Sequence, residues 1–445
     1  MRVSVVGTGY VGLVSAACLA DVGHEVVCVD TNEAKVRRIN AGESPIYEKG
    51  LSQILQRNLG IRLRATLDLA GAINASELTL VAVGTPFVAG VIDLQYVIEV
   101  SREIGEVLKD KADYHVVVVK STVVPGTTDE VVLPLLERYS GKIAGADFGV
   151  GMNPEFLREG EAILDFMKPD RIVLGGIDTE TRQKLTEVYA PFASSDQIAT
   201  NNKTAEMIKY ASNSLLATLI SFSNEIGNLC GSIGGVDALE VMQGLHLDKR
   251  LCPILADGTR IRPAVVTYLE AGCGFGGSCF PKDVKALISY GVDLGEPMSL
   301  LKSVIEINDR QPRQVIDRLR RHYADFAGRR IAVLGLAFKP GTDDMRESPA
   351  IPIVRELLDG NAVVNAYDPV AQEEAKKIFS EGEVAYCSTM EEAVDGVEAI
   401  LLLTRWEEFT SLPDLLKRRN VSPIVVDGRR LLAKDSVEVY EGIGI

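Results

Sequence analysis

Cysteine and histidine are scarce in this sequence, and neither is arranged as a metal site. Seven cysteines are present, an odd number, and no two form a C-x-x-C pair. This usage fits a reducing compartment and predicts no zinc site. The four histidines, at positions 24, 115, 246 and 322, fall outside every motif described below. We therefore assign none of them as a catalytic base, and we expect no metal.

Long apolar runs and an excess of positive charge are also missing. No window approaches the roughly 18 uninterrupted apolar residues of a membrane span. The apolar start MRVSVVGTGYVGLVSAACLADVG contains glycines and lacks a small-residue cleavage site, which predicts a strand, a turn and a helix rather than a signal. With 47 Lys and Arg against 62 Asp and Glu, the net charge of -15 argues against nucleic acid or an anionic membrane as a partner. We expect a cytoplasmic protein.

The first two hundred residues have the pattern of an α/β domain. RVSVVGTGYVGLVSAACLADVGHEVVCVD joins two apolar runs through a glycine turn and a helical pattern, which is typical of a βαβ unit. Further apolar runs lie at 77–86 and 114–122, with a helical segment at 94–109. Apolar strands separated by helices indicate a parallel sheet that is covered on both faces. Residues 1–200 are predicted to form a doubly wound, Rossmann-like domain.

The pattern then changes twice along the chain of 445 residues, which is too long for one hydrophobic core. From Thr204, its candidate cap, a helix of about thirty residues is expected, with an apolar stripe that must be buried against the flanking domains or a second copy. Strand patterns return at 329–344, so the chain is predicted to have a central helical domain at 201–320 and a second α/β domain at 321–445.

The stretch GTGYVG indicates a dinucleotide site. Gly7, Gly9 and Gly12 have the G-x-G-x-x-G spacing between a strand and a helix, where a pyrophosphate can approach the helix N-terminus. A glycine turn that binds nothing is the alternative. Asp30 disfavours that alternative, because it ends the next strand at the position that hydrogen-bonds a ribose diol. Its charge would repel a 2′-phosphate, which favours NAD over NADP. Lys35 is either a phosphate ligand or a solvated helix charge.

Two other places contain candidate catalytic or binding residues. Glu155 and Glu159 follow an apolar strand and would face one side if their segment were helical, although helix capping is an equal alternative. Lys209 and Asn213 are spaced i, i+4 on the long helix, where a desolvated lysine could act on an oxyanion. Most such pairs are exposed on the surface without a function, so a catalytic role for Lys209 and Asn213 depends on the apolar sequence around them.

The stretch GFGGSCFPKD places one thiol before a helix. Most lone cysteines are small buried hydrophobes. Here glycines would let the backbone approach a ligand, and Pro281 is a favoured first residue of a helix, so Cys279 would stand at its N-terminus. Together with Lys282, that position favours a thiolate. Asp283 is either a helix-start acid or a base for water.

A dinucleotide fold with an activated cysteine can oxidise an alcohol to an acid. An aldehyde has no second hydride to give until a nucleophile adds to its carbonyl. A thiolate adds readily, the thiohemiacetal can lose a hydride, and water then cleaves the resulting thioester.

These motifs together resemble the UDP-glucose/GDP-mannose dehydrogenase family. GTGYVG with Asp30, VGTP, STVVPGTT, NPEFLREG, AEMIKYASNS, GFGGSCFPKD and LGLAFKPGTDDMRESP occur in family order over nearly the whole chain. The resemblance implies two Rossmann-like domains joined by a long helix around which subunits dimerise. It also implies a twofold oxidation of a nucleotide sugar by two NAD molecules through a cysteine thioester.

The resemblance also implies roles for single residues. The residues that resemble the catalytic set are Cys279 as nucleophile, Lys209 for the oxyanion, Asn213 and Asp283 for water, and Thr122 and Glu155 for protons. The positions that resemble cofactor contacts are Gly7, Gly9, Tyr10, Val11, Gly12, Asp30, Lys35, Thr85, Thr122, Glu159, Lys282 and Arg346. The positions similar to substrate contacts are Glu155, Phe156, Leu157, Lys209, Asn213, Tyr268, Leu269, Gly272, Gly276, Lys339 and Arg429.

Some questions stay open at this point. Extra residues precede the cysteine loop, so either Arg260 or Arg262 could be the arginine that crosses a dimer interface in the family. NPEFLREG, FMKPDRIVLG, TRWEEF and VVDGRRLL favour UDP-glucose as the substrate, whereas DFGVGMNPEFLRE and the tyrosine of TYLEAG also resemble the GDP-mannose branch. A two-electron dehydrogenase and an inactive nucleotide-sugar sensor are further alternatives, although neither needs Cys279.

Overall fold

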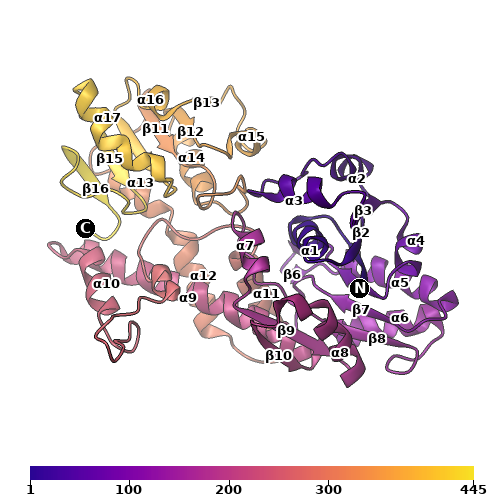
Figure 1. Ribbon diagram of the computed structural model, residues 1–445. Coiled ribbons are helices and arrows are strands. Elements are labelled where there is room, and N and C mark those ends of the chain that lie inside the picture. Colours follow the sequence, from indigo (N-terminus) through magenta and orange to yellow (C-terminus); the bar gives the residue numbers. More distant parts are fainter. The chain divides into compact units, whose positions relative to one another are not determined.

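A computed structural model describes residues 1–445. The chain divides into two compact units, Met1–Ser212 and Asn213–Ile445, and each contains one large, mainly parallel sheet. Figure 1 shows both sheets with helices around them. None of the helices combines the length and the apolar character that crossing a membrane requires.

The first unit has an eight-stranded sheet in the order β10-β9-β8-β7-β4-β1-β2-β3. All neighbours are parallel except β8 and β9. Strand order reverses between β1 and β4, and ligands of open α/β sheets bind at the carboxyl ends of strands at such a point. The strands are β1 (Arg2–Val6), β2 (Glu25–Val29), β3 (Leu63–Thr66), β4 (Leu78–Val81), β7 (His115–Val119), β8 (Phe148–Met152), β9 (Arg171–Gly176) and β10 (Asp196–Thr200).

Helices cover both faces of this sheet. Val116 and Val118 belong to one buried cluster and Val117 and Val119 to another, because successive side chains of a strand point to opposite faces. A small hairpin stands apart, formed by β5 (Phe87–Val88) and β6 (Val91–Ile92). The helices are α1 (Tyr10–Asp21), α2 (Glu33–Asn40), α3 (Leu51–Asn58), α4 (Leu69–Asn74), α5 (Gln95–Asp110), η1 (Thr128–Val132), α6 (Leu133–Ser140), α7 (Ala162–Met167), α8 (Thr179–Val188) and η2 (Ala190–Phe192).

The long helix α9 (Asn202–Ile233) has 32 residues, close to the predicted length. Its predicted cap is wrong by one turn. The side chain of Asn201 accepts a hydrogen bond from the Thr204 N–H at 2.8 Å, so Asn201 caps the helix and Thr204 lies inside it. The capping geometry requires an acceptor three residues before the N–H that it satisfies, and Asn201 is the residue at that position.

The second unit has a fully parallel six-stranded sheet in the order β13-β12-β11-β14-β15-β16. Its strands are β11 (Arg330–Leu334), β12 (Val363–Tyr367), β13 (Val384–Tyr386), β14 (Ala399–Leu402), β15 (Ile424–Asp427) and β16 (Val439–Gly442). Its helices are α10 (Ala238–His246), η3 (Ala264–Tyr268), α11 (Phe280–Asp293), α12 (Ser299–Arg310), α13 (Arg313–Leu319), α14 (Ala350–Asp359), α15 (Gln372–Ala375), α16 (Met390–Ala393), η4 (Glu407–Ser411) and α17 (Leu412–Arg419).

The predicted fold class is confirmed: in sequence order, a doubly wound α/β region is followed by a mainly helical section and then by a second doubly wound α/β region. The predicted boundaries at residues 200 and 320 stay a prediction.

Candidate active site

The glycine turn after β1 has the geometry of a pyrophosphate site. A Cβ atom on Gly7 would lie 2.7 Å from the Ala82 carbonyl oxygen, and one on Gly12 would lie 1.9 Å from the Gly7 carbonyl oxygen. A Cβ on Gly9 would meet nothing within 4 Å. The first and third glycines thus permit tight packing, while Gly9 caps α1 without a side chain and leaves its N–H groups open to an anion. The residues present fit a dinucleotide.

Asp30 follows β2 and is anchored on both of its oxygens. Oδ2 accepts from the Thr8 N–H at 2.9 Å and the Thr8 hydroxyl at 2.6 Å, and Oδ1 accepts from the Asn32 N–H at 2.9 Å. Burial raises the pKa of Asp30, but these hydrogen bonds outweigh burial and hold the pKa below its usual value. Lys35 Nζ lies 3.9 Å from Oδ2. The carboxylate is therefore charged and oriented beside the glycine turn.

The segment after β8 is not helical, so the condition for a shared face is not met. Residues 153–158 form no regular structure, so Glu155 and Glu159 do not share a helix face. Pro154 disfavours helical conformation only at Asn153, the residue before it. This segment contacts the glycine turn through Tyr10, whose hydroxyl donates to Glu48 and accepts from the Gly160 N–H at 2.8 Å.

Glu155 and Lys209 form a buried ion pair. Lys209 Nζ donates to Glu155 Oε1 at 2.9 Å, and the two side chains are only 3% and 5% exposed. Burial raises the pKa of Glu155, but the Lys209 ammonium and the Leu157 N–H outweigh burial, so the net pKa is below its usual value. Lys209 also lies 5.6 Å from the ring of Phe156, a predicted substrate contact. The structure thus brings together residues that stand 54 positions apart in the sequence.

The loop between β7 and η1 carries Thr122 and is tied to α9. The hydroxyl of Thr85 donates to the Thr122 carbonyl oxygen at 2.8 Å. Glu206, which is fully buried, accepts from the Gly126 N–H at 2.6 Å and from the N–H and hydroxyl of Thr128 at 2.8 and 2.7 Å. Burial raises the pKa of Glu206 to about 7. Glu206 stands one turn before Lys209, so the helix that carries the lysine also holds this loop.

In the second unit, Cys279 is the N-cap residue of α11, as predicted. Six of the seven cysteines are buried, and Cys279 alone is partly exposed. Its Sγ lies 3.5 Å from the hydroxyl of Ser278. The N–H groups of the first helical turn favour an anion at this end, which suits a thiolate.

The glycines before Cys279 have a structural use that the sequence did not predict. A Cβ on Gly276 would lie 2.2 Å from the Glu347 carbonyl oxygen, and one on Gly277 would lie 2.7 Å from the ring of Phe338. The Gly277 N–H donates to the Arg346 carbonyl oxygen at 2.8 Å. In this structure the glycines therefore admit the segment after β11 and not only a ligand.

Asn213, Lys282 and Asp283 meet beside Cys279. Asp283 is fully buried in the first turn of α11. Its Oδ2 accepts from the Asn213 amide at 2.6 Å, and its Oδ1 accepts from Lys282 Nζ at 2.6 Å. The prediction that Asn213 and Asp283 act together on water has this hydrogen bond as its geometric basis.

Arg429 stands after β15 with its guanidinium directed at carbonyl groups. Nε, Nη1 and Nη2 donate to the carbonyl oxygens of residues 403, 274 and 338, at 2.7, 2.8 and 3.4 Å. Two of its five N–H groups remain for a ligand. The Arg429 N–H donates to Asp427 at 2.9 Å, and burial raises the pKa of Asp427 although that bond and the Leu432 N–H oppose the rise.

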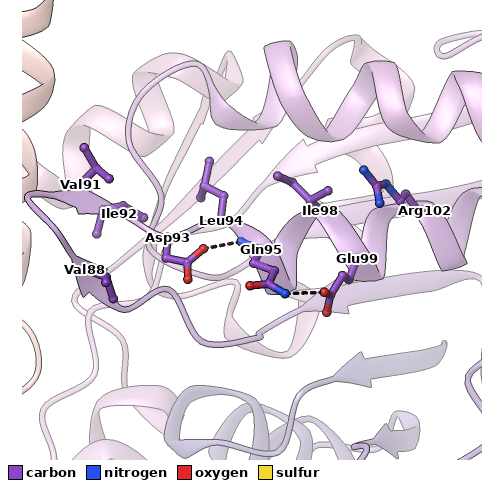
Figure 2. Close-up of a pocket in the computed structure, with 9 residues that line it drawn as sticks. All are labelled: Val88, Val91, Ile92, Asp93, Leu94, Gln95, Ile98, Glu99 and Arg102. Atoms are coloured by element: carbon purple, nitrogen blue, oxygen red, sulfur yellow. Dashed lines mark hydrogen bonds between the residues drawn. The ribbon is translucent and has the colours of Figure 1, made fainter.

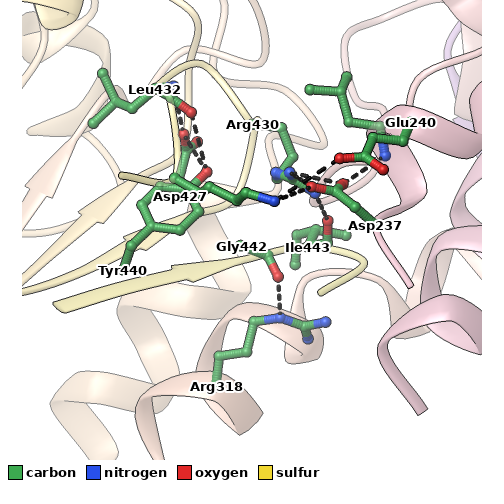
Figure 3. A network of polar contacts seen from close by, with 11 residues as sticks. Asp237, Glu240, Arg318, Asp427, Arg430, Leu432, Tyr440, Gly442 and Ile443 are labelled. Atoms are coloured by element: carbon green, nitrogen blue, oxygen red, sulfur yellow. Dashed lines mark hydrogen bonds and ion pairs between the residues drawn. The ribbon is translucent and has the colours of Figure 1, made fainter. Parts of the chain in front are cut away.

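Arg430 and the last strand complete this region. Figure 3 shows Arg430 Nη2 between the two oxygens of Asp237, each at 2.9 Å, and Arg318 on the Gly442 carbonyl oxygen at 2.6 Å. Tyr440 donates to Asp427 at 3.1 Å. Arg430 is therefore bonded to the N-cap residue of α10, whereas a diphosphate contact by Arg429 stays a prediction.

The remaining predicted positions lie in loops of the second unit. Tyr268 ends η3, and Leu269 and Gly272 follow, where the Gly272 N–H donates to Asn224 at 2.8 Å. Glu270 in the same stretch pairs with Arg405. Lys339 and Arg346 lie between β11 and α14, and Arg346 pairs with Asp344 at 2.7 Å. Arg260 and Arg262 both bond within their own chain, to the Leu247 carbonyl oxygen and to His246.

A shallow groove of about 530 Å³ lies elsewhere in the first unit, between the β5–β6 hairpin and α5. Figure 2 shows its lining, which contains none of the predicted site residues.

Comparison with known protein families assigns a separate domain model to each of three parts of the chain. Residues 1–193, 203–310 and 332–434 match the NAD binding, central and UDP binding domains of the UDP-glucose/GDP-mannose dehydrogenase family. The chain is 42% identical over 448 residues to the UDP-glucose 6-dehydrogenase AglM of Haloferax volcanii, with 100% of both chains covered. The chain belongs to the UDP-glucose/GDP-mannose dehydrogenase family.

Other members of the family also match this chain over most of its length. A GDP-mannose 6-dehydrogenase of Pseudomonas putida is 40% identical over 423 residues, with 93% of both chains covered. A solved UDP-glucose dehydrogenase of Pyrobaculum islandicum superposes with a TM-score of 0.88 at 39% identity, over 99% of this chain and 97% of that one. The predicted family and the predicted cofactor are confirmed: the protein is an NAD-dependent nucleotide-sugar dehydrogenase.

Sequence reasoning missed several residues that shape the site. Lys120 and Asn153, described below, lie beside the Glu155 and Lys209 pair, and Arg405 holds the backbone of Arg429 through its carbonyl oxygen at 2.8 Å. Lys120 had one visible signal, since a single charge directly follows the apolar run VVVV at the carboxyl end of a parallel strand. Arg405 lies in the motif TRWEEF, but its bond to the Arg429 carbonyl oxygen could not be foreseen because the two residues are 24 positions apart.

Proposed function

We propose that this enzyme oxidises UDP-glucose to UDP-glucuronate in two successive oxidations, with Cys279 as a covalent nucleophile. The observation that carries the proposal is the placement of the one partly exposed cysteine at the N-terminus of α11, next to the Asn213–Asp283 hydrogen bond. A two-electron dehydrogenase has no use for a thiol at this position.

The chemistry follows in balanced steps. The C6 alcohol of the sugar loses a hydride and a proton and becomes an aldehyde. The Cys279 thiolate adds to the aldehyde carbon, and the alkoxide that forms loses a second hydride to give a thioester. Water then adds to the thioester and the bond to sulfur breaks, which releases the carboxylate and the two protons of the water and regenerates the Cys279 thiolate. NAD, when bound, supplies a hydride acceptor for each of the two oxidations.

The residues of the two units have distinct parts in this proposal. Lys209 donates to the oxyanion, and Glu155 and Thr122 assist in taking up and relaying protons. Asn213 and Asp283 hold the attacking water, supported by their 2.6 Å hydrogen bond. For the cofactor, we propose contacts from the glycine turn, Asp30 and Lys35, and from the more distant positions Tyr10, Val11, Thr85, Thr122, Glu159, Lys282 and Arg346.

UDP-glucose is the proposed substrate because a relative named as a UDP-glucose 6-dehydrogenase, AglM, matches this chain over the full length of both proteins. The proposed contacts are the main chain of residues 268–272, Gly276 and Lys339, with the two remaining N–H groups of Arg429 on the diphosphate. GDP-mannose is the second candidate, since a GDP-mannose 6-dehydrogenase is 40% identical. A pocket built to hydrogen-bond uracil would reject guanine, because mismatched buried polar groups would be left unpaired.

The decisive experiment measures NADH formed per sugar for the purified enzyme with UDP-glucose, UDP-galactose, UDP-N-acetylglucosamine and GDP-mannose. We expect two NADH per UDP-glucose. One NADH per sugar would reject the thioester route, and rapid turnover of GDP-mannose alone would reject the substrate.

Replacing Cys279 with serine tests the nucleophile directly. We expect Cys279→Ser to lower formation of the acid by about 10³-fold or more, because a neutral hydroxyl is a far weaker nucleophile at pH 7 than a thiolate. Cys273→Ser serves as the matched control for a cysteine in the same stretch, since Cys273 is fully buried. Acid formation by Cys279→Ser at a rate near the wild type would reject covalent catalysis, whereas unchanged NAD affinity in titration would show that the variant is folded.

We also propose that the enzyme is a homodimer and that it works in the cytoplasm. Support for the location comes from the seven cysteines, which are all unbridged. Support for the dimer comes from α9, on which the apolar side chains of Leu215, Phe222 and Leu229 are exposed.

A further inference from the structure

Lys120 is a buried cation that the proposed mechanism does not use. It directly follows β7, at the carboxyl edge of the first sheet, and only 3% of it is exposed. Its ammonium donates to Asn153 Oδ1 at 2.8 Å and to the Tyr189 hydroxyl at 3.4 Å. Both of these partners are neutral. A buried charge without a paired opposite charge costs stability, so its retention calls for a reason.

The side chains around Lys120 are arranged to keep it in place. Asn153 uses its amide N–H₂ on the Val173 carbonyl oxygen at 2.9 Å, which leaves its oxygen for Lys120 and the Tyr189 hydroxyl. The Asn153 N–H also donates to the Val119 carbonyl oxygen at 2.9 Å. Lys120 is thus held in place by two neutral side chains, those of Asn153 and Tyr189.

The charged groups that act on Lys120 are Glu155 and Lys209. The pKa of Lys120 is lowered to about 8, chiefly by burial; Glu155 opposes the fall and Lys209 contributes to it. Lys120 in turn helps to lower the pKa of Glu155. With both lysines protonated, the group holds two ammonium ions and one carboxylate. The Glu155 and Lys209 pair alone would be neutral, so Lys120 supplies the excess positive charge.

We propose that Lys120 is a positioning residue that acts through Glu155 and Lys209. Its ammonium gives these three side chains a net charge of +1, which a single oxyanion of the substrate would balance. The inference rests on the proposed function. It explains how Lys209 can remain an effective cation while it is bonded to a carboxylate. In a water-excluded site such fixed charge stabilises an oxyanion more than it would in water.

The test compares Lys120→Gln, which keeps a hydrogen-bond donor without charge, with Lys120→Arg, which keeps the charge. Kinetics are measured at pH 7 with saturating NAD and with the nucleotide sugar that the wild type oxidises. We expect Lys120→Gln to lower kcat about 10- to 100-fold, with KM for NAD unchanged and thermal stability equal or higher. Lys120→Arg should recover most of kcat. A purely structural lysine would give the opposite result, with lower stability and a normal kcat.

A second measurement isolates the charge. Glu155→Gln in the Lys120→Gln background restores one excess positive charge, so it should lower kcat by a smaller factor there than in the wild type. Equal factors in both backgrounds, or a normal kcat for Lys120→Gln, would overturn the inference. The outcome is separate from that of the proposed function. If Cys279→Ser retains activity but Lys120→Gln is slow, the thioester route fails and the charge balance stands, because the first oxidation also passes through an alkoxide.

Discussion

Asp30 holds the glycine turn in place, and we propose that it also contacts the cofactor. Its three hydrogen bonds to Thr8 and Asn32 fix the glycine turn against the end of β2. A carboxylate has room for about four hydrogen bonds, so one position remains for a ribose hydroxyl. Asp368 occupies the equivalent position in the second sheet, but five donors surround it: four backbone N–H groups and the indole of Trp406. The second aspartate is therefore structural.

We predict that Asp30→Asn lowers the preference for NAD over NADP at least 10-fold. The substitution removes the charge that repels a 2′-phosphate and weakens the acceptor for the ribose diol. The measurement is kcat/KM for both cofactors. Glu33→Gln, which removes an exposed charge three residues away, is the control and should leave the ratio unchanged. An unchanged ratio for Asp30→Asn would take Asp30 out of the cofactor site.

The sequence could predict the position of residues whose structural setting is formed by their near neighbours in the chain. The glycine spacing, Asp30 after a strand and Cys279 before a helix are each defined within one turn or one βαβ unit. Lys120 and Glu206 were missed because their partners lie 33 or more residues away, on other elements. The fold class followed from alternating apolar runs, whereas the cap at Asn201 depended on a single side chain.

At the scale of elements, three neighbouring strands are joined by buried polar side chains. Ser4 of β1 bonds to Thr79 of β4 at 2.7 Å, and Thr79 bonds to His115 Nε2 of β7 at 2.8 Å. His115 Nδ1 lies 3.2 Å from the Ser76 carbonyl oxygen. The pKa of His115 falls to about 3, because burial disfavours its charged form and Lys111 adds to the effect. This histidine is therefore a neutral part of the sheet and not a catalytic base.

We predict that His115 makes the first unit less stable in acid. The unfolded histidine takes up a proton near pH 6.5, whereas the folded one does so only near pH 3, so its contribution is present above pH 6.5 and is lost as pH falls toward 3. At pH 4.5 the loss should be about 2 to 3 kcal/mol. Urea unfolding of the wild type and His115→Gln should therefore differ less at pH 4.5 than at pH 7. A constant difference would show that His115 does not titrate on unfolding.

At the scale of the whole molecule, one face of α9 has no cover within the chain. Leu215, Phe222 and Leu229 recur every seven residues and are 58%, 43% and 56% exposed, and Ile233 is 62% exposed. Each such side chain gains about 1.5 to 3 kcal/mol on full burial. A seven-residue repeat of exposed apolar side chains is typical of a helix that packs against another helix. A second copy of this chain is the partner that we propose.

We predict that the protein has twice the 48.2 kDa chain mass in light scattering, and that Phe222→Asp converts it to a monomer. A charge in the middle of an apolar interface would have to be desolvated without a partner. Ile61→Asp is the control, because Ile61 is 73% exposed in the other unit and should leave the mass unchanged. A wild-type protein that runs as a monomer at micromolar concentration would reject the dimer.

The burial of six of the seven cysteines has a practical consequence. A water-soluble thiol reagent added to native enzyme should modify one equivalent per chain, and the remaining six should become accessible only in denaturant. With Cys279 as the nucleophile that we propose, the fast equivalent would count competent active centres in any preparation, independently of total protein. Oxidative loss of activity during storage can accordingly be followed as a falling titre of that single thiol, before any change in fold is visible.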